Sequence, residues 1–367
     1  MKPNSGNSQC AVCNYQCQYF YYGVKCCESC KHFFRRTISL MKEYKCKNGG
    51  ECKDLASCKR CRLYKCLTAP EQKELMNLIM VQNLLQIEQK VRRIRYSQTP
   101  VPEHFYSQCD TFESIFSRKL NLIELSNKFS TKPSPPAAIY LEKARQFGPF
   151  CVRPAPVVMD LLLVFEIGKT FPFFDQLDNN DKIALCSNIA MPLFVLCNSF
   201  YSVQQNCDVL CTPDGLMPIT NFHNSYYKQD PVAMGMGDKV FCNAMQPFIR
   251  LKLSNEEFVL MRAITYSHMV SPGLSDHAQN LLYSEAEKYS ALLMSVVQAN
   301  YGPAVGALRY MELMGLIECI FNTGAKHRQL LTYISNVLDP NFDKVFPPVL
   351  AKISTKGPVE SHQLFPY

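Results

Sequence analysis

From about residue 105 to the end of the sequence, apolar residues recur at the spacing of one face of an α-helix. The longest such face follows Ser275 and contains Leu282, Ala286, Tyr289, Leu293 and Val296. Another helix is expected to begin at Ser254 and run to His268, because Ser254 and Glu257 have the spacing of a capping box. The pattern therefore predicts a mainly α fold, with an all-helical domain over residues 105–367.

Two further segments of this region carry local signals. Gly302-Pro303 is expected to start a helix that continues through Leu308, Met311, Met314 and Ile317. Strand signals are few, and the segment from Cys207 to Ile219, around Pro213-Asp214-Gly215, is the candidate for a short hairpin.

Residues 71–104 are predicted to form a hinge or linker ahead of the helical domain. Helical periodicity covers Glu71 to Ile94, and two prolines, Pro100 and Pro102, follow it. The end of this helix carries the basic cluster Arg92-Arg93-Ile94-Arg95. Such a cluster fits a nuclear-import element and fits a solvated helix end equally well, so both interpretations stay open.

The N-terminal part has a different composition from the rest. Eleven of the 19 cysteines lie in residues 1–66, which also hold 13 Lys and Arg against 4 Asp and Glu, a formal charge of +9. The remainder of the chain must then sum to −1, because the whole chain carries +8. The first residues lack the apolar core of a secretory signal, and no run of 18 apolar residues is found, so neither a disulfide framework nor a membrane partner is expected.

The spacing of these cysteines predicts two zinc sites. The first set of candidate ligands is Cys10, Cys13, Cys27 and Cys30, and the second is Cys46, Cys52, Cys58 and Cys61. Four thiolates suit tetrahedral zinc in a closed structural site, whereas a catalytic zinc would keep an open position. The alternative is a set of buried free cysteines. Cys17, Cys26 and Cys66 are expected to be non-ligands, because Cys27 has the better spacing to Cys30.

A helix is expected after Cys27, with one face formed by Cys27, Cys30, Phe34, Ile38 and Met41. A second face of that helix carries Glu28, Lys31, His32 and Arg35. Lys and Arg donate to guanine in the DNA major groove, and a carboxylate accepts from cytosine. These side chains therefore predict a DNA recognition helix, with a charged solvated surface as the alternative.

The order of these residues resembles the DNA-binding domain of nuclear hormone receptors. The resemblance rests on Tyr22-Gly23-Val24, on Cys27-Glu28-Ser29-Cys30-Lys31-His32-Phe33-Phe34-Arg35-Arg36 and on Cys58-x-x-Cys61-Arg62-Leu63. It implies a domain over residues 7–70 in which Glu28, Ser29 and His32 choose the half-site and Lys31 and Arg35 contact bases. It also implies that Tyr22 and Arg36 lie near phosphates. Departures such as the five residues between Cys52 and Cys58 indicate the expanded nematode branch of the family.

The helical domain resembles the same family through Lys169-x2-Pro172-x-Phe174-x2-Leu177-x3-Asp181-Lys182. The resemblance implies a helical-sandwich ligand-binding domain with a coactivator groove formed by Lys169, Val349, Leu350 and Ile353. Lys352 stands where the family places a glutamate that clamps the coactivator helix. Cys197 stands where many members have a ligand-anchoring arginine, and Pro192 is expected to interrupt that helix.

Together these features predict a zinc-dependent, sequence-specific transcription factor in the nucleus. The resemblance implies double-stranded DNA, transcriptional coregulators, a second receptor in a homo- or heterodimer, and a small lipophilic ligand as partners. No acid, base or nucleophile stands in a catalytic arrangement, so an enzyme is not expected. The rival interpretation is a protein-interaction scaffold whose zinc module does not bind specific DNA sequences.

Overall fold

The computed structural model describes residues 9–17, 20–21, 24–39, 42, 44–50, 52, 54–55, 57–68, 70–133, 156–339, 342 and 346–356. The chain divides into two compact units, Met1–Asn83 and Leu84–Tyr367. Helices dominate the described residues, and the strands found there are two residues long, which confirms the predicted mainly α fold. The second half of the segment 71–104, which the sequence suggests as a hinge, lies within the second unit.

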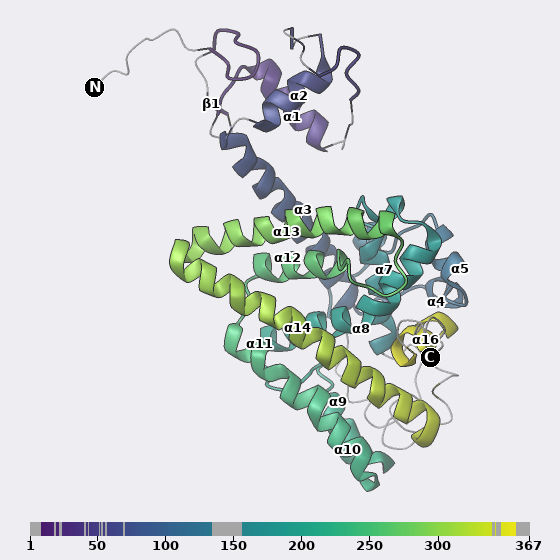
Figure 1. Ribbon diagram of the computed structural model, residues 1–367. Coiled ribbons are helices and arrows are strands. Elements are labelled where there is room, and N and C mark those ends of the chain that lie inside the picture. Colours follow the sequence, from purple (N-terminus) through teal and green to yellow (C-terminus); the bar gives the residue numbers. More distant parts are fainter. Residues whose placement is uncertain are drawn as a thin grey trace, which may run out of the picture. The chain divides into compact units, whose positions relative to one another are not determined.

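The first unit contains a strand pair and two helices (Figure 1). β1 Phe20–Tyr21 pairs antiparallel with β2 Val24–Lys25. The helices α1 Glu28–Ser39 and α2 Lys59–Thr68 contact each other. Cys30, Phe34 and Cys66 are at most 3% exposed and lie in one small core with Val12. A core of this size is mostly sulfur and a few apolar rings, so it depends on further constraints for its stability.

The helix α3 Pro70–Arg95 begins in the first unit and ends in the second, which confirms the predicted helix over Glu71–Ile94. Its early residues Met76 and Ile79 pack against the core of the first unit. Its last turns belong to the helical domain, where Glu88 and Arg95 are each 2% exposed.

The basic cluster at the end of α3 is neither a solvated helix end nor a free import element. Arg95 donates from Nε and Nη2 to the two carboxylate oxygens of Asp160, at 2.9 and 3.3 Å. Arg92 donates from Nε to Glu88 Oε1 of its own helix at 2.7 Å and from Nη2 to Asn255 Oδ1 at 3.3 Å. Arg93 donates from Nε to the carbonyl oxygen of Phe129 at 2.9 Å. Although burial by itself lowers the pKa of Arg95, the Asp160 carboxylate raises it above the ordinary value. The three arginines therefore hold α3 to the helical domain.

The described helices of the second unit follow in chain order after α3. They are α4 Glu103–Ser107, α5 Phe112–Ser117, η1 Glu124–Lys128, α7 Pro156–Gly168, η2 Phe174–Gln176, α8 Asn179–Gln204, α9 Pro218–Asn224, η3 Tyr226–Gln229, α10 Pro231–Gly237, η4 Asp238–Cys242, η5 Asn243–Met245, α11 Gln246–Leu251, α12 Asn255–Tyr266, α13 Asp276–Tyr301, α14 Pro303–Tyr333, η6 Ile334–Leu338 and α16 Pro348–Thr355. η4 and η6 have π-helical geometry.

The long helices form a layered sandwich around α8. This central helix packs against α7 and α12 as well as α14, and α13 packs against both α12 and α14 (Figure 1). The C-terminal helix α16 packs against α7, α8 and α14. α8 is long and apolar enough to cross a membrane by length and composition alone, but 78% of its most apolar stretch is buried in the domain, as expected of a core helix.

Pro192 does not interrupt α8, contrary to the expectation from the sequence. The helix runs through Pro192, where the neighbouring helix α14 passes very close. A Cβ atom at Gly324 of α14 would lie 2.8 Å from the Pro192 nitrogen. Because Gly324 has no Cβ atom, α14 packs directly against the backbone of α8 at Pro192, a residue without an N–H group.

Side-chain caps fix where several helices begin. Ser254 and Glu257 form the predicted capping box of α12, with both hydrogen bonds present. Asp178 caps α8 by accepting from the Asp181 amide at 2.8 Å. The buried Asp181 carboxylate in turn accepts from the amide and hydroxyl of Ser275, the cap of α13, at 2.7 and 2.8 Å. The starts of α8 and α13 are therefore joined.

Two local expectations need correction. Cys207–Ile219 forms no strands; instead Thr212 and Leu216 close a turn in which Gly215 has a φ of 84°. The predicted helix after Gly302 is present as α14, but Leu308 and Met311 on it are 64% and 69% exposed. They form an outer apolar stripe with Tyr301 and Val305, whereas residues such as Leu313 and Leu316 of α14 enter the core.

His327 of α14 gives the helical domain a pH dependence. Its ring lies between those of Phe194 and Phe241, with centroids 5.4 and 5.6 Å away, and its Nε2 has no hydrogen-bond partner among the described residues. Burial lowers its pKa from 6.5 to about 4, despite a hydrogen bond with the backbone of Val240. On acidification the unfolded chain therefore binds this proton at a higher pH than the folded chain does. The stability that depends on neutral His327 is fully present above pH 6.5 and is lost as the pH falls from 6.5 toward 4.

The expected loss at pH 5 from this group is about 2 kcal/mol relative to neutral pH. Urea unfolding at pH 7 and pH 5, followed by circular dichroism, measures it. His327→Phe removes the titrating ring, and the difference between the two pH values should shrink by that amount. An unchanged difference in the variant would show that other groups set the pH dependence.

Candidate zinc centres and nucleic-acid interface

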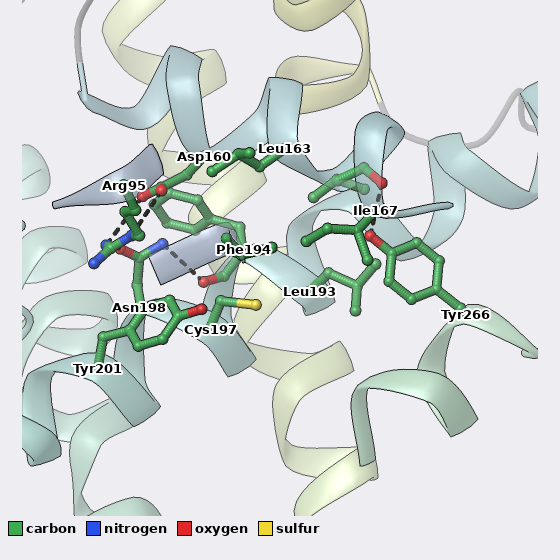
Figure 2. Close-up of a pocket in the computed structure, with 12 residues that line it drawn as sticks. Arg95, Asp160, Leu163, Ile167, Leu193, Phe194, Cys197, Asn198, Tyr201 and Tyr266 are labelled. Atoms are coloured by element: carbon green, nitrogen blue, oxygen red, sulfur yellow. Dashed lines mark hydrogen bonds and ion pairs between the residues drawn. The ribbon is translucent and has the colours of Figure 1, made fainter. Parts of the chain in front are cut away.

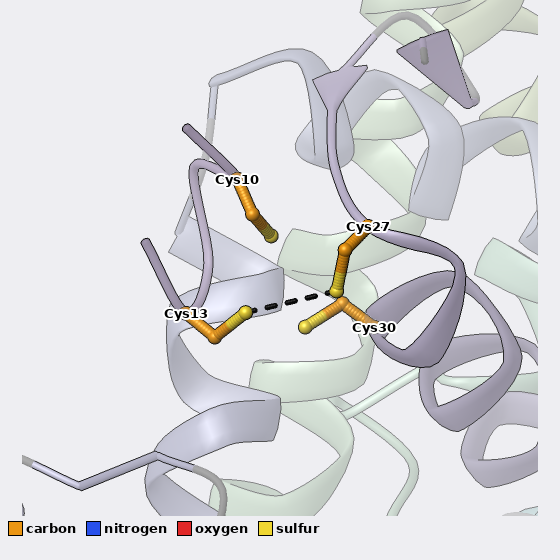
Figure 3. A group of neighbouring side chains, drawn as sticks. All are labelled: Cys10, Cys13, Cys27 and Cys30. Atoms are coloured by element: carbon orange, nitrogen blue, oxygen red, sulfur yellow. Dashed lines mark hydrogen bonds between the residues drawn. The ribbon is translucent and has the colours of Figure 1, made fainter. Parts of the chain in front are cut away.

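The first four predicted zinc ligands come together at the start of α1. Cys10 and Cys13 lie on a tight turn in which the Asn14 amide donates to the Cys10 carbonyl at 2.9 Å. Cys27 directly precedes α1, and Cys30 lies in its first turn. Figure 3 shows the four side chains pointing toward one another, and their sulfur atoms all lie within 4.8 Å of each other.

The second four predicted ligands meet at the start of α2. Cys46 Sγ lies 3.6 Å from Cys52 Sγ, 3.8 Å from Cys58 Sγ and 3.7 Å from Cys61 Sγ. Zinc–sulfur bonds of about 2.3 Å in a tetrahedron place the sulfur atoms about 3.8 Å apart. The spacing in both groups therefore fits one zinc ion each, which confirms the two predicted zinc ions as cofactors.

The remaining cysteines of the first unit belong to neither group. Cys17, Cys26 and Cys66 are at most 8% exposed and lie in the core beside the first zinc site. None of the three belongs to either group of sulfur atoms that lie within 4.8 Å of one another. The prediction that these three cysteines are non-ligands agrees with the two clusters.

The predicted recognition stripe lies on α1 and faces solvent along most of its length. Glu28, His32 and Arg35 are exposed, and Lys31 is half-buried. His32 Nε2 lies 3.6 Å from Glu28 Oε1, one turn earlier. Tyr22, which the resemblance places near a phosphate, lies outside the described residues, as do the side chains of Ile38 and Met41.

A second face of α1 opens onto a basic groove. Its lining residues are Ser29, His32, Phe33, Arg36, Thr37, Lys42, Tyr44, Lys59 and Arg62. Arg62 of α2 donates from Nη2 to Ser29 Oγ at 2.9 Å and to Cys30 Sγ at 3.1 Å, and its guanidinium lies 4.8 Å from the centre of the Phe33 ring. Phe33 stacks on Tyr44 at 5.9 Å. The groove offers several cations to a polyanion next to the recognition stripe.

The resemblance gave Ser29, His32 and Arg36 of this lining as DNA-contacting residues but did not include Lys42, Lys59 and Arg62. These three come from segments beyond α1, so helical periodicity could not join them to it. The sequence did hold a signal for Arg62, because this residue directly follows the metal ligand Cys61 and therefore lies close to a zinc site.

Lys169, the predicted clamp lysine, lies at the end of α7 and is largely buried. Its Nζ lies 3.2 Å from Oε1 of Glu166, a carboxylate that Arg118 also contacts. Glu166 Oε2 accepts from the Leu122 amide at 2.6 Å. Burial lowers the pKa of Lys169, and Glu166 opposes that effect.

The other predicted groove residues lie on the inner face of α16. Val349, Leu350 and Ile353 are at most 4% exposed and pack into the helical domain. The α16 backbone is tied down as well: the Val349 amide donates to the Cys109 carbonyl at 3.0 Å, and Arg328 Nη2 donates to the Ile353 carbonyl at 3.3 Å. These side chains therefore position α16, while Lys352 on the same helix is exposed.

A small cavity lies where α7 and α8 face the end of α3. Figure 2 shows the Arg95–Asp160 pair at one end, with Asn198 beside it, and Cys197 on its wall. The cavity has a volume of about 20 Å³, and a single water needs roughly 10–15 Å³ by this measure. It therefore accommodates about one water molecule in the present conformation.

Two family models match the chain, one to each unit described above. Residues 8–73 match the double treble clef zinc finger of C4 type, and residues 157–335 match the ligand-binding domain of nuclear hormone receptor. The chain belongs to the nuclear hormone receptor family. Membership confirms that this receptor is not an enzyme, because members of the family act as ligand-regulated transcription factors.

Similar proteins support the same assignment and its nematode branch. Nuclear hormone receptor family member nhr-35 of Caenorhabditis elegans is 28% identical over 322 residues, which cover 80% of this receptor and 58% of the relative. Family member nhr-60 of the same organism is 25% identical, covering 78% of this receptor and 76% of the relative. This receptor thus spans little more than half the length of nhr-35 but about three quarters of nhr-60.

Proposed function

We propose that this receptor is a nuclear, zinc-dependent transcription factor that binds specific DNA sequences through α1. The observation that carries the proposal is the stripe of exposed Glu28, His32 and Arg35 and half-buried Lys31 on a helix anchored at its start by a cluster of four cysteines. A helix of this width fits the major groove, and its mixed donors and acceptor suit base edges. The family as a whole is nuclear, which supports the location.

Different residues of α1 are expected to have different tasks. Lys31 and Arg35 would contact bases, with Glu28, Ser29 and His32 choosing among half-sites, while Arg36 would contact a phosphate from the basic groove. Ser29 and Arg36 both line that groove with Lys42 and Lys59. Phosphate contacts set position and affinity, and base contacts set sequence preference.

Substitutions separate these tasks. Lys31→Ala and Arg35→Ala are each expected to weaken specific binding by about 1–3 kcal/mol while leaving binding to random DNA nearly unchanged. Arg36→Ala should weaken binding to every sequence similarly and flatten the dependence of affinity on salt. Fluorescence anisotropy with a selected site and a scrambled duplex, titrated at several salt concentrations, measures both quantities.

The same measurement tests the rival interpretation as a protein-interaction scaffold. A scaffold would bind selected and scrambled duplexes alike, and substitutions on the stripe would then change neither the preference nor the salt slope. If Lys31→Ala reduced both affinities equally, the stripe would be a phosphate-binding surface and the base-reading face would lie elsewhere.

We also propose that the helical domain binds transcriptional coregulators next to α16. The activation surface consists of Phe165 of α7, Lys169 directly after that helix, Phe174 of η2, Lys182 of α8 and Lys352 of α16. Val349, Leu350 and Ile353 hold α16 in place beneath it. An apolar centre with cations at its edges suits a short amphipathic helix.

The remaining partners have weaker support. The exposed apolar stripe of Val305, Leu308 and Met311 on α14, with Tyr301 at the end of α13, supports a homo- or heterodimer with another receptor. A small lipophilic ligand would have to enlarge the cavity beside Arg95, because pockets for such molecules measure roughly 300–1,000 Å³.

A further inference from the structure

The short helix α5 covers the activation surface. The Phe112 ring lies 6.2 Å from the Phe165 ring, and the Phe116 ring lies 6.2 Å from Phe165 and 5.9 Å from Phe174. Ile115, between them, is fully buried. The two rings cover the apolar centre of the surface, and Figure 1 shows α4, α5, α7 and α16 at one end of the helical domain.

The spacing of these side chains is that of a helix bound in a groove. Phe112, Ile115 and Phe116 stand at positions i, i+3 and i+4, so they share one face of α5. Glu113 and Ser117, on the other side, are exposed. An amphipathic partner helix docks with the same arrangement of apolar anchors, so α5 presents what such a partner would present.

The cations at the edge of the activation surface already contact α5 and the residues after it. Lys182 Nζ lies 5.9 Å from the centre of the Phe116 ring, and Lys352 Nζ lies 5.7 Å from that of Phe112. Both distances are within the range of a cation–π contact. Lys352, which stands where the family has a clamp glutamate, therefore contacts an aromatic ring of this chain.

The clamp lysine is engaged as well. Lys169 shares the Glu166 carboxylate with Arg118, the C-cap residue of α5, and with the Leu122 amide. Asn121 Nδ2 donates to the Glu166 carbonyl at 2.9 Å. The segment that leaves α5 is thus bonded to the residue that holds Lys169, and an outside helix could not reach Lys169 without moving it.

We propose that α5 is an internal occupant of the activation surface, which a coregulator helix must displace before it binds. The proposal rests on the proposed function only for the identity of the displacing partner. The contacts of α5 with Phe165, Phe174, Lys182 and Lys352 stand without it. The receptor is then held in a closed state by its own chain.

The energetics allow such a displacement. A helix of six residues is not stable by itself in water, so α5 keeps its shape only while docked. α5 lies in the connection between Arg95, where α3 ends, and Pro156, where α7 begins. A tethered segment competes at an effective concentration of about 1 mM, and the apparent Kd of an outside helix rises by the ratio of closed to open molecules.

The experiment uses the full-length, zinc-loaded receptor and a fluorescent amphipathic peptide with leucines at i, i+3 and i+4. Phe112→Ser/Phe116→Ser is expected to bind this peptide at least about tenfold more tightly than the unmodified receptor, because the internal competitor is lost. The control is Phe129→Ser, which removes a buried ring from the same connection at a residue whose carbonyl oxygen accepts from Arg93 of α3. Phe116→Ser alone replaces the double variant if the latter does not fold, since Phe116 is only half-buried.

A second peptide tests occupancy without any coregulator. The peptide of residues 110–120 should bind the double variant and compete with the leucine peptide, and it should bind the unmodified receptor weakly. Hydrogen exchange adds the direct readout: saturating leucine peptide should deprotect the amides of α5 and protect those around Phe165 and Lys182.

The outcomes distinguish the two proposals. If the 110–120 peptide binds but the leucine peptide does not, α5 occupies the surface and the coregulator function fails. If the leucine peptide binds the unmodified and double-variant receptors equally while α5 keeps its exchange protection, the internal occupant is overturned and the coregulator function stands. An equal gain in Phe129→Ser would also overturn it, since general loosening of the connection would then explain the effect.

Discussion

Removal of both zinc ions is expected to unfold the first unit of this receptor completely while the helical domain stays folded. The first unit has a small core of cysteines and a few apolar side chains, and each metal site joins segments that are separated in the sequence. Structural zinc binding contributes about 10–16 kcal/mol in comparable small modules, more than such a core supplies by itself. Chelation should therefore abolish DNA binding and leave most of the helical circular dichroism signal.

Two serine substitutions with the same atomic change sharpen this test. Cys10→Ser removes a ligand of the first site and should lower the zinc content from two ions to one and unfold the module. Cys17→Ser changes a buried core cysteine that lies outside both clusters, and it should keep both ions and most of the affinity for DNA. Equal damage from the two substitutions, or a folded DNA-binding protein with fewer than two ions, would contradict the ligand assignment.

Glu88→Gln is expected to destabilise the helical domain by about 3–5 kcal/mol, because it leaves a buried cation without its counter-charge. Glu88 Oε2 accepts from Arg262 Nη1 at 2.6 Å, and its two oxygens accept from the Tyr201 hydroxyl at 3.1 and 3.2 Å. Arg262 is itself 2% exposed, so no water replaces the lost carboxylate. Chemical unfolding of the zinc-loaded receptor measures the change in the free energy of unfolding of the helical domain.

The control for Glu88→Gln is the same substitution at Glu318, an exposed position of α14, where a change within about 0.5 kcal/mol is expected. Adding Arg262→Met to Glu88→Gln should recover part of the lost stability, since the unpaired charge is then gone. A Glu88→Gln protein as stable as the control would mean that the end of α3 is not part of the folded domain.

The zinc module was accessible to sequence analysis because its chemistry is local. Cys27 and Cys30, like Cys58 and Cys61, reach one metal ion through the geometry of a single helical turn, and only thiolates in this number close a zinc site. The stripe from Glu28 to Arg35 follows from the period of the same helix. The basic groove beside it does not, because Lys42, Lys59 and Arg62 reach it only after the chain has folded back.

In the helical domain, by contrast, the environment of the charged residues could not be predicted from the local sequence. Arg95 looked like the end of a solvated basic cluster, since its partner Asp160 stands 65 positions away and nothing in the local pattern joins them. The interruption expected at Pro192 was wrong for a similar reason, because Gly324 on another helix makes room for that backbone. Phe112, Ile115 and Phe116 had a helical spacing in the sequence, yet only their contacts with Phe165 and Phe174 reveal what they cover.

For this receptor, the sequence by itself determined the features that depend on neighbours within a turn or two: the zinc ligands, the polar stripe along α1, the helix cap at Ser254, and the mainly α fold. The tertiary structure alone decided which charges are buried, how small the cavity beside Arg95 is, and that α5 lies on the activation surface. The physical reason is the separation in sequence over which each kind of interaction acts. Metal coordination, helical periodicity and capping act between residues close in sequence, whereas desolvation and packing depend on what distant segments bring against a side chain.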